Sequence, residues 1–417
     1  MTRRIHLGLS TCPNDTFLAH ALLTGALETP GLEFEIELLD VQALNERLVA
    51  GDFDVAKASY HIALERGAEL VALSVGSALG FGNGPLLLAR PGTSPQATPG
   101  KGDRILAPGA NTTATLLYRL FHAEGAEPEH VVFSEIMPAL GRGEADYGVC
   151  IHEGRFTYED TGLVLIEDLG AAWEGATNVP LPLGGLFARR SLDEETLDRV
   201  AQALRSSLEA ADEDPDAALP TMREHAQELD DEVIQAHVEL YVNGWTRRLG
   251  PQGERAIAEL ARRAHSVGLL PRGAEPLRVF EPYGTRRVFH IVPDAGRDDV
   301  ARHGELKPPS LASEGFVHLS FVDQLEGTLD AHFGGSDVAL VMELDPRELA
   351  DDVRFEVSRG GERFPHLYRP LDLGEDVLER WELRRAASGR FELPPAVAWS
   401  LPSWSAPDFG APPERTA

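Results

Sequence analysis

A histidine that leaves an apolar strand is the residue best suited to acid–base chemistry in this 417-residue chain. His152 follows the run Val149-Cys150-Ile151 and stands in the densest polar cluster of the sequence, which continues as Glu-Gly-Arg-Phe-Thr-Tyr. An imidazole titrates near neutral pH, so it can accept and return protons under physiological conditions. We interpret His152 as a candidate general base, with Glu153 or a backbone carbonyl fixing its tautomer. A purely structural histidine is the alternative.

Three further polar segments stand where a strand gives way to a helix. A helix N-terminus has unpaired backbone N–H groups and a partial positive charge, so it favours a bound carboxylate or phosphate. We expect Asn14, Asp15 or Thr16 to cap the first of these helices. Each segment taken alone also fits an ordinary cap or a solvated side chain. The candidate binding residues are Ser10, Asn14, Asp15, Thr16, Lys57, Ala58, Ser59, Thr112, Thr113 and Ala114.

The sequence contains no pattern typical of a metal ion or an organic cofactor. Phe156 stands four residues after His152, where a His-Glu-x-x-His zinc motif needs its second histidine, and no Gly-x-Ser-x-Gly nucleophile turn occurs. Cys12 and Cys150 are too few for a four-cysteine metal cluster or a disulfide framework. We therefore find no sequence signal for a metal site.

Short β-like runs alternate with helical patterns from residue 5 to about 270, which predicts an α/β architecture with mainly parallel sheets. The predicted strands are 5–9, 71–75, 85–89, 104–107 and 131–133. The predicted helices are 17–23, 113–122, 194–211 and 253–266, and the predicted surface loops are 91–103 and 212–220.

A helix-to-strand turn of the form Gly-acid-x-Asp occurs twice, at Gly51-Asp-Phe-Asp54 and at Gly143-Glu-Ala-Asp146. Two similar lobes with a ligand held between them would explain this repeat. The alternative is that the pattern is only a common turn. Lys57 ends the strand that follows the first copy, where α/β folds bind ligands, and it is one of only three lysines in the chain.

The chain is strongly acidic: 38 Lys and Arg against 67 Asp and Glu give a net charge of −29. Such a surface repels nucleic acid and anionic membranes, so we expect neither of them as a partner. No run of about 18 apolar residues and no signal-peptide pattern is present, so the expected location is the cytoplasm. The oligomeric state is not predicted.

A break rich in Gly and Pro at residues 268–276 is followed by short strand-like runs at 288–292, 316–319 and 338–344 with few long helices. This change predicts a second, α+β domain. We divide the chain into residues 1–283, residues 284–393 and a Pro-rich tail at 394–417. The tail is expected to be extended or poorly ordered unless Trp399 and Trp404 dock.

The polar segments of the first domain together resemble the 1,4-dihydroxy-6-naphthoate synthase family of the futalosine route to menaquinone. The resemblance spans roughly residues 4–280, and two positions differ: residue 111 is Asn where some members have His, and residue 154 is Gly rather than Ser. The matching segments include Ser10-Thr-Cys-Pro-Asn-Asp-Thr-Phe17, Lys57-Ala-Ser59, Gly76-Ser-Ala-Leu-Gly-Phe-Gly-Asn-Gly-Pro85, Asn111-Thr-Thr-Ala114 and Ile151-His-Glu-Gly-Arg-Phe-Thr-Tyr158.

This resemblance implies a fold like the type II periplasmic binding proteins, with two α/β lobes that close on the substrate. It implies a carbon–carbon lyase that acts on a small-molecule substrate without a metal or organic cofactor. The implied reaction cleaves cyclic dehypoxanthine futalosine to 1,4-dihydroxy-6-naphthoate with release of dihydroxyacetone. It also implies that His152 is the proton acceptor and that residues 57–59 and 113–114 line the substrate. A cytoplasmic solute-binding module and chorismate dehydratase remain alternatives, and the His152 cluster favours the lyase over both.

The second domain resembles a small bacterial family, domain of unknown function 952, over about residues 288–380. The resemblance rests on Val288-Phe-His-Ile291, on 304–320 and on Phe364-Pro-His-Leu-Tyr368, and it implies an ADP-ribosyltransferase-like fold. We expect a pocket for a nucleotide or another phosphorylated compound. Structural histidines or a metal site at His290, His318 and His366 are the alternatives. The candidate pocket residues are His290, His318, Ser320, Glu343 and His366.

Overall fold

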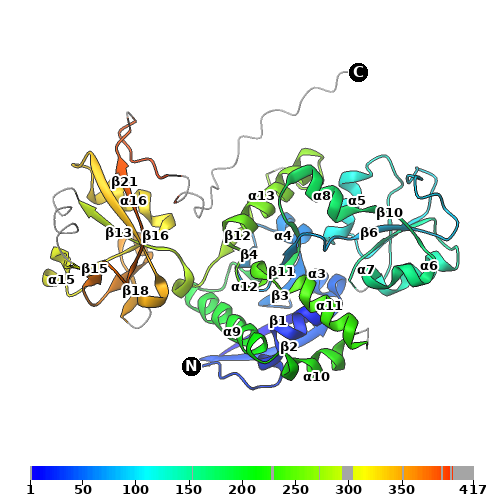
Figure 1. The fold of residues 1–417 in the computed structure, drawn as a ribbon, viewed down its shortest axis with the longest axis horizontal. Helices are drawn as coiled ribbons and strands as arrows, with labels where there is room; N and C mark the ends of the chain where they lie inside the picture. Colours follow the sequence, from blue (N-terminus) through cyan, green and yellow to red (C-terminus); the bar gives the residue numbers. More distant parts are fainter. Residues whose placement is uncertain are drawn as a thin grey trace. The chain divides into compact units, whose positions relative to one another are not determined.

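The computed structural model describes residues 2–152, 154–226, 230–271, 273–293, 304–349, 352–386, 388–394 and 397. Glu153, Trp399 and Trp404 therefore lie outside the described residues. Contacts between residues divide the chain after Phe280 into two compact units. Figure 1 shows the elements of both units.

The first lobe of the first unit is built on a mixed sheet of order β12-β4-β11-β3-β1-β2, with β5 also paired to β11. Its strands are β1 (Arg3–Ser10), β2 (Leu32–Leu39), β3 (Val55–Ser59), β4 (Leu70–Leu73), β5 (Ala78–Gly80), β11 (Leu181–Arg189) and β12 (Arg278–Phe280). Its helices are α1 (Pro13–Leu18), α2 (His20–Leu23), α3 (Val41–Ala50), α4 (Tyr60–Glu65), α9 (Glu194–Glu213), α10 (Pro215–His225), α11 (Asp231–Tyr241), α12 (Gly244–Arg247) and α13 (Gly250–Ser266).

The second lobe contains a five-stranded sheet of order β10-β6-β9-β7-β8. Its strands are β6 (Leu86–Ala89), β7 (Ile105–Ala107), β8 (Glu129–His130), β9 (Tyr147–Cys150) and β10 (Val164–Asp168). Its helices are α5 (Thr113–Phe121), α6 (Phe133–Gly141), α7 (Gly154–Thr157), the 3₁₀ helix η1 (Tyr158–Thr161) and α8 (Leu169–Thr177). The chain enters this lobe after β5 and returns to the first sheet as β11, so two connections join the lobes (Figure 1).

The two lobes confirm the interpretation of the repeated turn. Gly51 ends α3 with φ of 91° and Gly143 follows α6 with φ of 70°, a backbone region that favours glycine. The first turn leads into β3 of one sheet and the second into β9 of the other. Each copy of the motif therefore serves the same purpose, reversing the chain from a helix into a central strand of its lobe.

Three expectations about local structure are wrong. Half of the strand pairings in the first unit are antiparallel, because the connecting strand β11 runs against β3, β4 and β5, and β6 runs against β9 and β10. The strand expected at 131–133 is β8 at Glu129–His130, and Phe133 begins α6. The loop expected at 212–220 is instead the end of α9 and the start of α10, separated by Asp214. Asp214 accepts a hydrogen bond from the Ala217 backbone N–H, and Pro215 fits the first turn of α10.

The second unit consists of antiparallel strand pairs with short helices, which fits the predicted α+β organisation. Its strands are β13 (Val288–Pro293), β14 (Glu305–Leu306), β15 (Val317–His318), β16 (Ser320–Phe321), β17 (Val338–Leu344), β18 (Val353–Val357), β19 (Arg363–Leu367), β20 (Leu371–Asp372) and β21 (Val377–Arg384). Its helices are η2 (Tyr283–Thr285), α15 (Pro309–Ser313), η4 (Val322–Gln324), α16 (Leu325–His332), α17 (Pro346–Leu349) and η5 (Arg359–Gly361).

None of the helices in the described ranges is both long enough and apolar enough to cross a lipid bilayer.

Two glycines allow the backbone of the connection into the second lobe to touch α8. A Cβ atom on Gly84 would lie 2.3 Å from the Gly170 Cα, and one on Gly170 would lie 2.7 Å from the Gly84 Cα. No side chain fits between two backbones at such distances. The contact therefore fixes where the second lobe begins.

Replacing these glycines gives a test with a control in the same helix. Gly170→Ala should lower the free energy of unfolding by about 1–3 kcal/mol, because the new methyl group meets backbone atoms that cannot rotate away. Gly175→Ala, where the new Cβ would have no atom within 4 Å, should raise it by up to about 1 kcal/mol through helix propensity. Urea unfolding measures both, and equal effects would contradict the close contact.

Candidate functional site

A cleft with about 690 Å³ of empty space, partly open to solvent, is lined by residues from both lobes of the first unit. Eight of the ten predicted binding residues line it, together with His152. The first lobe contributes the ends of β1 and β3 and one face of α11, and the second lobe contributes the start of α5 and the residue after Ile151. The predicted residues in the lining are Ser10, Asn14, Lys57, Ala58, Ser59, Thr112, Thr113, Ala114 and His152.

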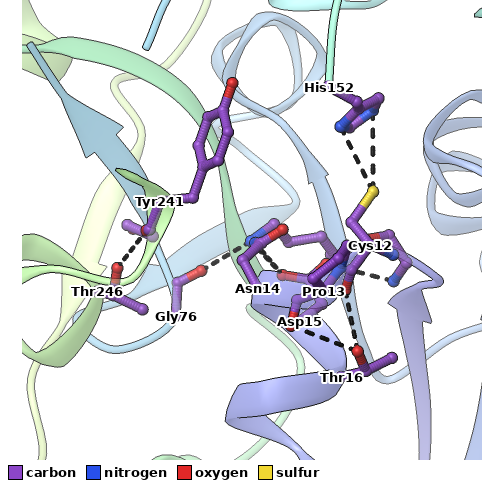
Figure 2. A network of polar contacts seen from close by, with 12 residues as sticks. Cys12, Pro13, Asn14, Asp15, Thr16, Gly76, His152, Tyr241 and Thr246 are labelled. Atoms are coloured by element: carbon purple, nitrogen blue, oxygen red, sulfur yellow. Dashed lines mark hydrogen bonds and ion pairs between the residues drawn. The ribbon is translucent and has the colours of Figure 1, made fainter. Parts of the chain in front are cut away.

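His152 lies in the turn that leaves β9, with its imidazole against the thiol of Cys12 from the other lobe. The Cys12 Sγ is 3.4 Å from Nδ1 and 3.9 Å from Nε2 of His152, and the ring of Phe133 lies edge-on at 4.8 Å between centroids. Figure 2 shows the sulfur at the start of α1 pointing at the His152 ring. The His152 φ of 55° is rare for a residue with a side chain, and such strain is concentrated at functional positions.

A buried ion pair joins Lys57 of β3 to Asp15 of α1. The Lys57 Nζ is 2.7 Å from the Asp15 Oδ1 and donates at 3.0 Å to the Gly76 carbonyl, and both charged side chains are more than nine-tenths buried. Asp15 also accepts hydrogen bonds from the Ser10 hydroxyl at 2.6 Å and from the Asn14 amide at 2.8 Å. The carboxylate is thereby surrounded by donors, which compensates for its burial.

Asp15 and Thr16 do not line the cleft, and neither they nor Asn14 caps α1. The N-cap of α1 is Cys12, which makes no side-chain capping bond, so all three residues lie inside the helix. The Thr16 hydroxyl bonds to the Cys12 and Pro13 carbonyls of its own helix. Asp15 points back toward Lys57 instead, so its role in the site is indirect.

The ion pair also fixes the state of His237, which lies on α11 and was not predicted from the sequence. Because the Asn14 Nδ2 donates to Asp15, the Asn14 Oδ1 faces the His237 Nε2 at 3.0 Å. His237 must then carry its proton on Nε2. A chain of polar contacts thus runs from Lys57 through Asp15 and Asn14 to a histidine on the cleft wall.

His237 is neutral over the whole physiological pH range. Its exposed fraction is 1%, and burial, followed by the nearby charges of His152 and Lys57, lowers its pKa from 6.5 to about 3. Its ring lies 6.4 Å from that of His152, nearly parallel, and 4.5 Å from that of Tyr241. The wall beside His152 is therefore an uncharged aromatic surface.

The start of α5 presents backbone amides to the cleft. Its side-chain hydroxyls already donate hydrogen bonds within the protein. The Thr112 hydroxyl caps the helix by accepting from the Thr115 N–H, and it donates to the Gly109 carbonyl at 2.9 Å. The Thr113 hydroxyl donates to the Leu183 carbonyl at 2.6 Å. Among the described contacts, the backbone N–H groups of Thr113 and Ala114 have no acceptor. These two amides at the positive end of a helix form a cradle for an anion.

Ser59 is the hydroxyl best placed to donate to a ligand. Its backbone N–H donates to the Asn45 Oδ1 at 2.9 Å, and the Asn45 amide donates to the Ser59 Oγ at 3.3 Å. The Ser59 hydroxyl therefore accepts within the protein and keeps its proton for a molecule in the cleft.

The second unit contains its own cavity, with about 1380 Å³ of empty space that includes open solvent. His290, His318 and Ser320 line it as predicted. Glu343 does not line it, because it forms an ion pair at 2.5 Å with Arg287, the residue just before β13. His366 does not line it either, because it stacks on Phe316 and bonds to Glu356 at 2.8 Å.

In the part of the chain that the structure describes, no group of three or more His, Cys, Asp or Glu side chains is arranged to hold a metal ion. The metal site considered for His290, His318 and His366 is therefore not formed by those residues.

The chain is similar to known proteins over two regions. A family model described as menaquinone biosynthesis matches residues 5–266, and one described as a protein of unknown function (DUF952) matches residues 291–379. The curated 1,4-dihydroxy-6-naphthoate synthase of Thermus thermophilus is 44% identical over 66% of this chain and 99% of its own length. The protein of that name from Streptomyces coelicolor is 41% identical over 64% of this chain and 95% of its own length.

Among solved structures, the alkanesulfonate-binding protein SsuA from Xanthomonas axonopodis pv. citri, bound to MOPS, is similar in fold. The TM-score is 0.51 at 17% identity, over 67% of this chain and 98% of that chain. The first unit therefore has a periplasmic-binding-protein-like fold, as the sequence predicted.

Removing the carboxylate of the buried ion pair should destabilise the first unit strongly. Asp15→Asn leaves the buried Lys57 ammonium without its counter-charge, so we expect a loss of about 3–5 kcal/mol in the free energy of unfolding. Glu69→Gln, which removes an exposed partner of Arg66, should change it by at most about 1 kcal/mol. Urea unfolding measures the free energy of unfolding of both variants. Similar losses in the two would show that Lys57 does not need Asp15 as its counter-charge.

His237 should make the stability of the protein sensitive to acid. Its pKa is about 3 when folded and 6.5 when unfolded, so only the unfolded chain binds the proton between these values. The contribution is fully present above pH 6.5 and falls as the pH drops toward 3. From pH 7 to pH 5, wild type should lose about 2 kcal/mol more than His237→Gln, measured by urea unfolding. Parallel losses in the two proteins would contradict the neutral, buried state.

Proposed function

The chain belongs to the menaquinone biosynthesis family, and we propose that its first unit is a carbon–carbon lyase, a 1,4-dihydroxy-6-naphthoate synthase with His152 as its general base. In this proposal the substrate is cyclic dehypoxanthine futalosine and the products are 1,4-dihydroxy-6-naphthoate and dihydroxyacetone. The observation that carries the assignment of the base is the position of His152, an imidazole in a strained turn at the meeting point of the two lobes.

The surroundings of His152 suit a proton acceptor that is held in a fixed position beside the substrate. Its ring is half-buried against Phe133 and Cys12, so it is held in place while one edge remains accessible from the cleft. The adjacent His237 is neutral and places no positive charge beside it. When His152 removes a proton from the substrate, a carbon–carbon bond breaks in a retro-aldol-like elimination. The electron pair of that bond enters the ring system that becomes aromatic.

The remaining cleft groups fit the negative charge of such a substrate. The Thr113 and Ala114 amides are suited to the carboxylate, because they point from the positive end of α5. The Ser59 hydroxyl has a proton to donate, and Lys57 uses two of its three ammonium protons on Asp15 and Gly76. Donors fixed in this way stabilise an oxyanion without having to reorganise.

The two alternatives fit the site less well. A solute-binding module needs donors for its ligand but has no use for a strained imidazole between the lobes. Chorismate dehydratase would share the fold, but both curated relatives carry the naphthoate synthase name at more than 40% identity. The lyase therefore remains the proposal.

Several further expectations accompany this proposal. The fusion of residues 1–283 to a separate domain at 284–393 is supported by the two compact units and the two family matches. A cytoplasmic location, activity without a cofactor and an ADP-ribosyltransferase-like fold of the second unit stay predictions.

A substitution at position 152 tests the base. His152→Asn should lower kcat by about 100- to 10,000-fold, because general base catalysis is lost, while KM changes little. His130→Asn, at an exposed position of β8 in the same lobe, should keep wild-type turnover. The assay follows naphthoate release from cyclic dehypoxanthine futalosine by the full chain. If wild type forms no product, the proposed lyase activity is wrong. If His152→Asn turns over normally, only the role of His152 as general base is wrong.

A further inference from the structure

The cavity of the second unit has a polar wall built from four elements. His290 comes from β13, Ser320 from β16, Thr328 from α16 and Arg359 from the turn that contains η5. Phe333 and Phe364 add an apolar side. A few converging polar groups on an otherwise apolar cavity are typical of a small-molecule site.

Arg359 is a cation that the surrounding protein does not neutralise. Its guanidinium donates to the Thr328 hydroxyl at 3.3 Å and lies 5.2 Å above the ring of Phe364, but it pairs with no carboxylate among the described residues. Other arginines of this unit do have such partners, for example Arg287 with Glu343 and Arg369 with Asp376. Most of the five N–H donors of Arg359 are therefore available to an anion.

The local backbone holds this guanidinium against the cavity. Gly360 and Gly361 follow Arg359 with φ values of 69° and 83°, so the turn reverses sharply after the arginine. On the facing helix, a Cβ atom on Gly327 would lie 3.2 Å from the Arg359 Nη2. Glycine at position 327 thus leaves the space in which the guanidinium lies.

His290 offers a complementary acceptor. Its Nδ1 lies 2.9 Å from the His318 carbonyl, so Nδ1 carries the proton and Nε2 carries a lone pair. Burial lowers the pKa of His290 to about 4, which keeps the ring neutral. Next to it, the Thr328 hydroxyl donates to the Gln324 carbonyl, so Ser320 donates to Thr328 and retains acceptor capacity. This part of the wall therefore accepts hydrogen bonds from ligand hydroxyl groups.

The charge of the cavity differs from that of the unit around it. Residues 284–417 contain 24 acidic and 15 basic residues, a net charge of −9. Only one of these carboxylates, Glu314, lines the cavity, and it is 3.1 Å from the Nε2 of His318. In this acidic unit the cavity thus offers an anion an arginine that no carboxylate of the described residues neutralises.

We propose that this cavity binds a small phosphate monoester that also carries hydroxyl groups, of the size of a pentose phosphate or a nucleoside monophosphate. The phosphate group would pair with Arg359, whose planar fork matches phosphate oxygens. The hydroxyl groups would donate to His290 and Ser320. This site is independent of the lyase cleft in the first unit, and its ligand class is narrower than the one that the sequence predicted.

Isothermal titration calorimetry on the full chain tests this site with ribose 5-phosphate, adenosine monophosphate, inorganic phosphate and ribose as probes. Ribose 5-phosphate should bind saturably and more tightly than inorganic phosphate, and ribose should not bind. Arg359→Gln should weaken ribose 5-phosphate binding by about 10- to 100-fold, since hydrogen bonds between charged groups are lost. If adenosine monophosphate binds more tightly than ribose 5-phosphate, the site binds a nucleoside monophosphate, with the rings of Phe333 and Phe364 in contact with the adenine.

Two further variants make the result specific. Arg384→Gln removes a highly exposed arginine of β21 and should bind like wild type. Gly327→Ala keeps every polar group of the wall, favours the α16 helix and presses on the guanidinium, so it should also weaken binding. Absence of ribose 5-phosphate binding, ribose binding as tightly as its phosphate, or an unchanged affinity in Arg359→Gln would each overturn the proposal.

Discussion

The ion pair between Lys57 and Asp15 is the interaction on which the lyase cleft depends. Burying two charges is unfavourable unless both are fully hydrogen-bonded, and here Ser10, Asn14 and the Gly76 carbonyl supply the missing partners. The pair also connects two elements, since Lys57 lies in β3 and Asp15 lies in α1. By fixing the amide of Asn14 it sets the tautomer of His237. One electrostatic requirement thus orders the floor of the cleft and the wall beside His152.

The two lobes contribute different chemistry to this cleft. The first lobe supplies the fixed polar floor, where Lys57 and Ser59 are held by internal partners. The second lobe supplies His152 and the amides at the start of α5. A substrate that reaches both sets of groups meets donors from both lobes and the base from the second lobe. This arrangement explains why the site needs two lobes.

Local patterns in the sequence identified most residues of the cleft but not their hydrogen-bonding roles. The strand ends and helix starts carrying Lys57, Thr113 and His152 were recognisable, because such junctions gather at one edge of an α/β sheet. His237 was not predicted as a site residue, because it lies in the middle of α11, far along the chain. Nothing in the neighbouring sequence distinguishes it from a core histidine. The Thr112 and Thr113 hydroxyls looked like ligands, yet capping and tertiary contacts use them, and only the backbone amides remain. The second unit was less predictable, because Glu343 and His366 pair with residues that are distant in the sequence or on another strand, Arg287 and Glu356.

The two units handle a positive charge in opposite ways, and the difference follows from burial. Lys57 is nearly inaccessible, so its charge must be neutralised within the protein, and attraction for an anion is left to uncharged donors at the start of α5. Arg359 is only half-buried and is supported by a ring and a hydroxyl, so its charge can remain uncompensated until an anion arrives. In a chain with a net charge of −29, long-range attraction for anions is absent. Recognition of an anionic molecule must therefore come from such short-range, pre-arranged donors in both units.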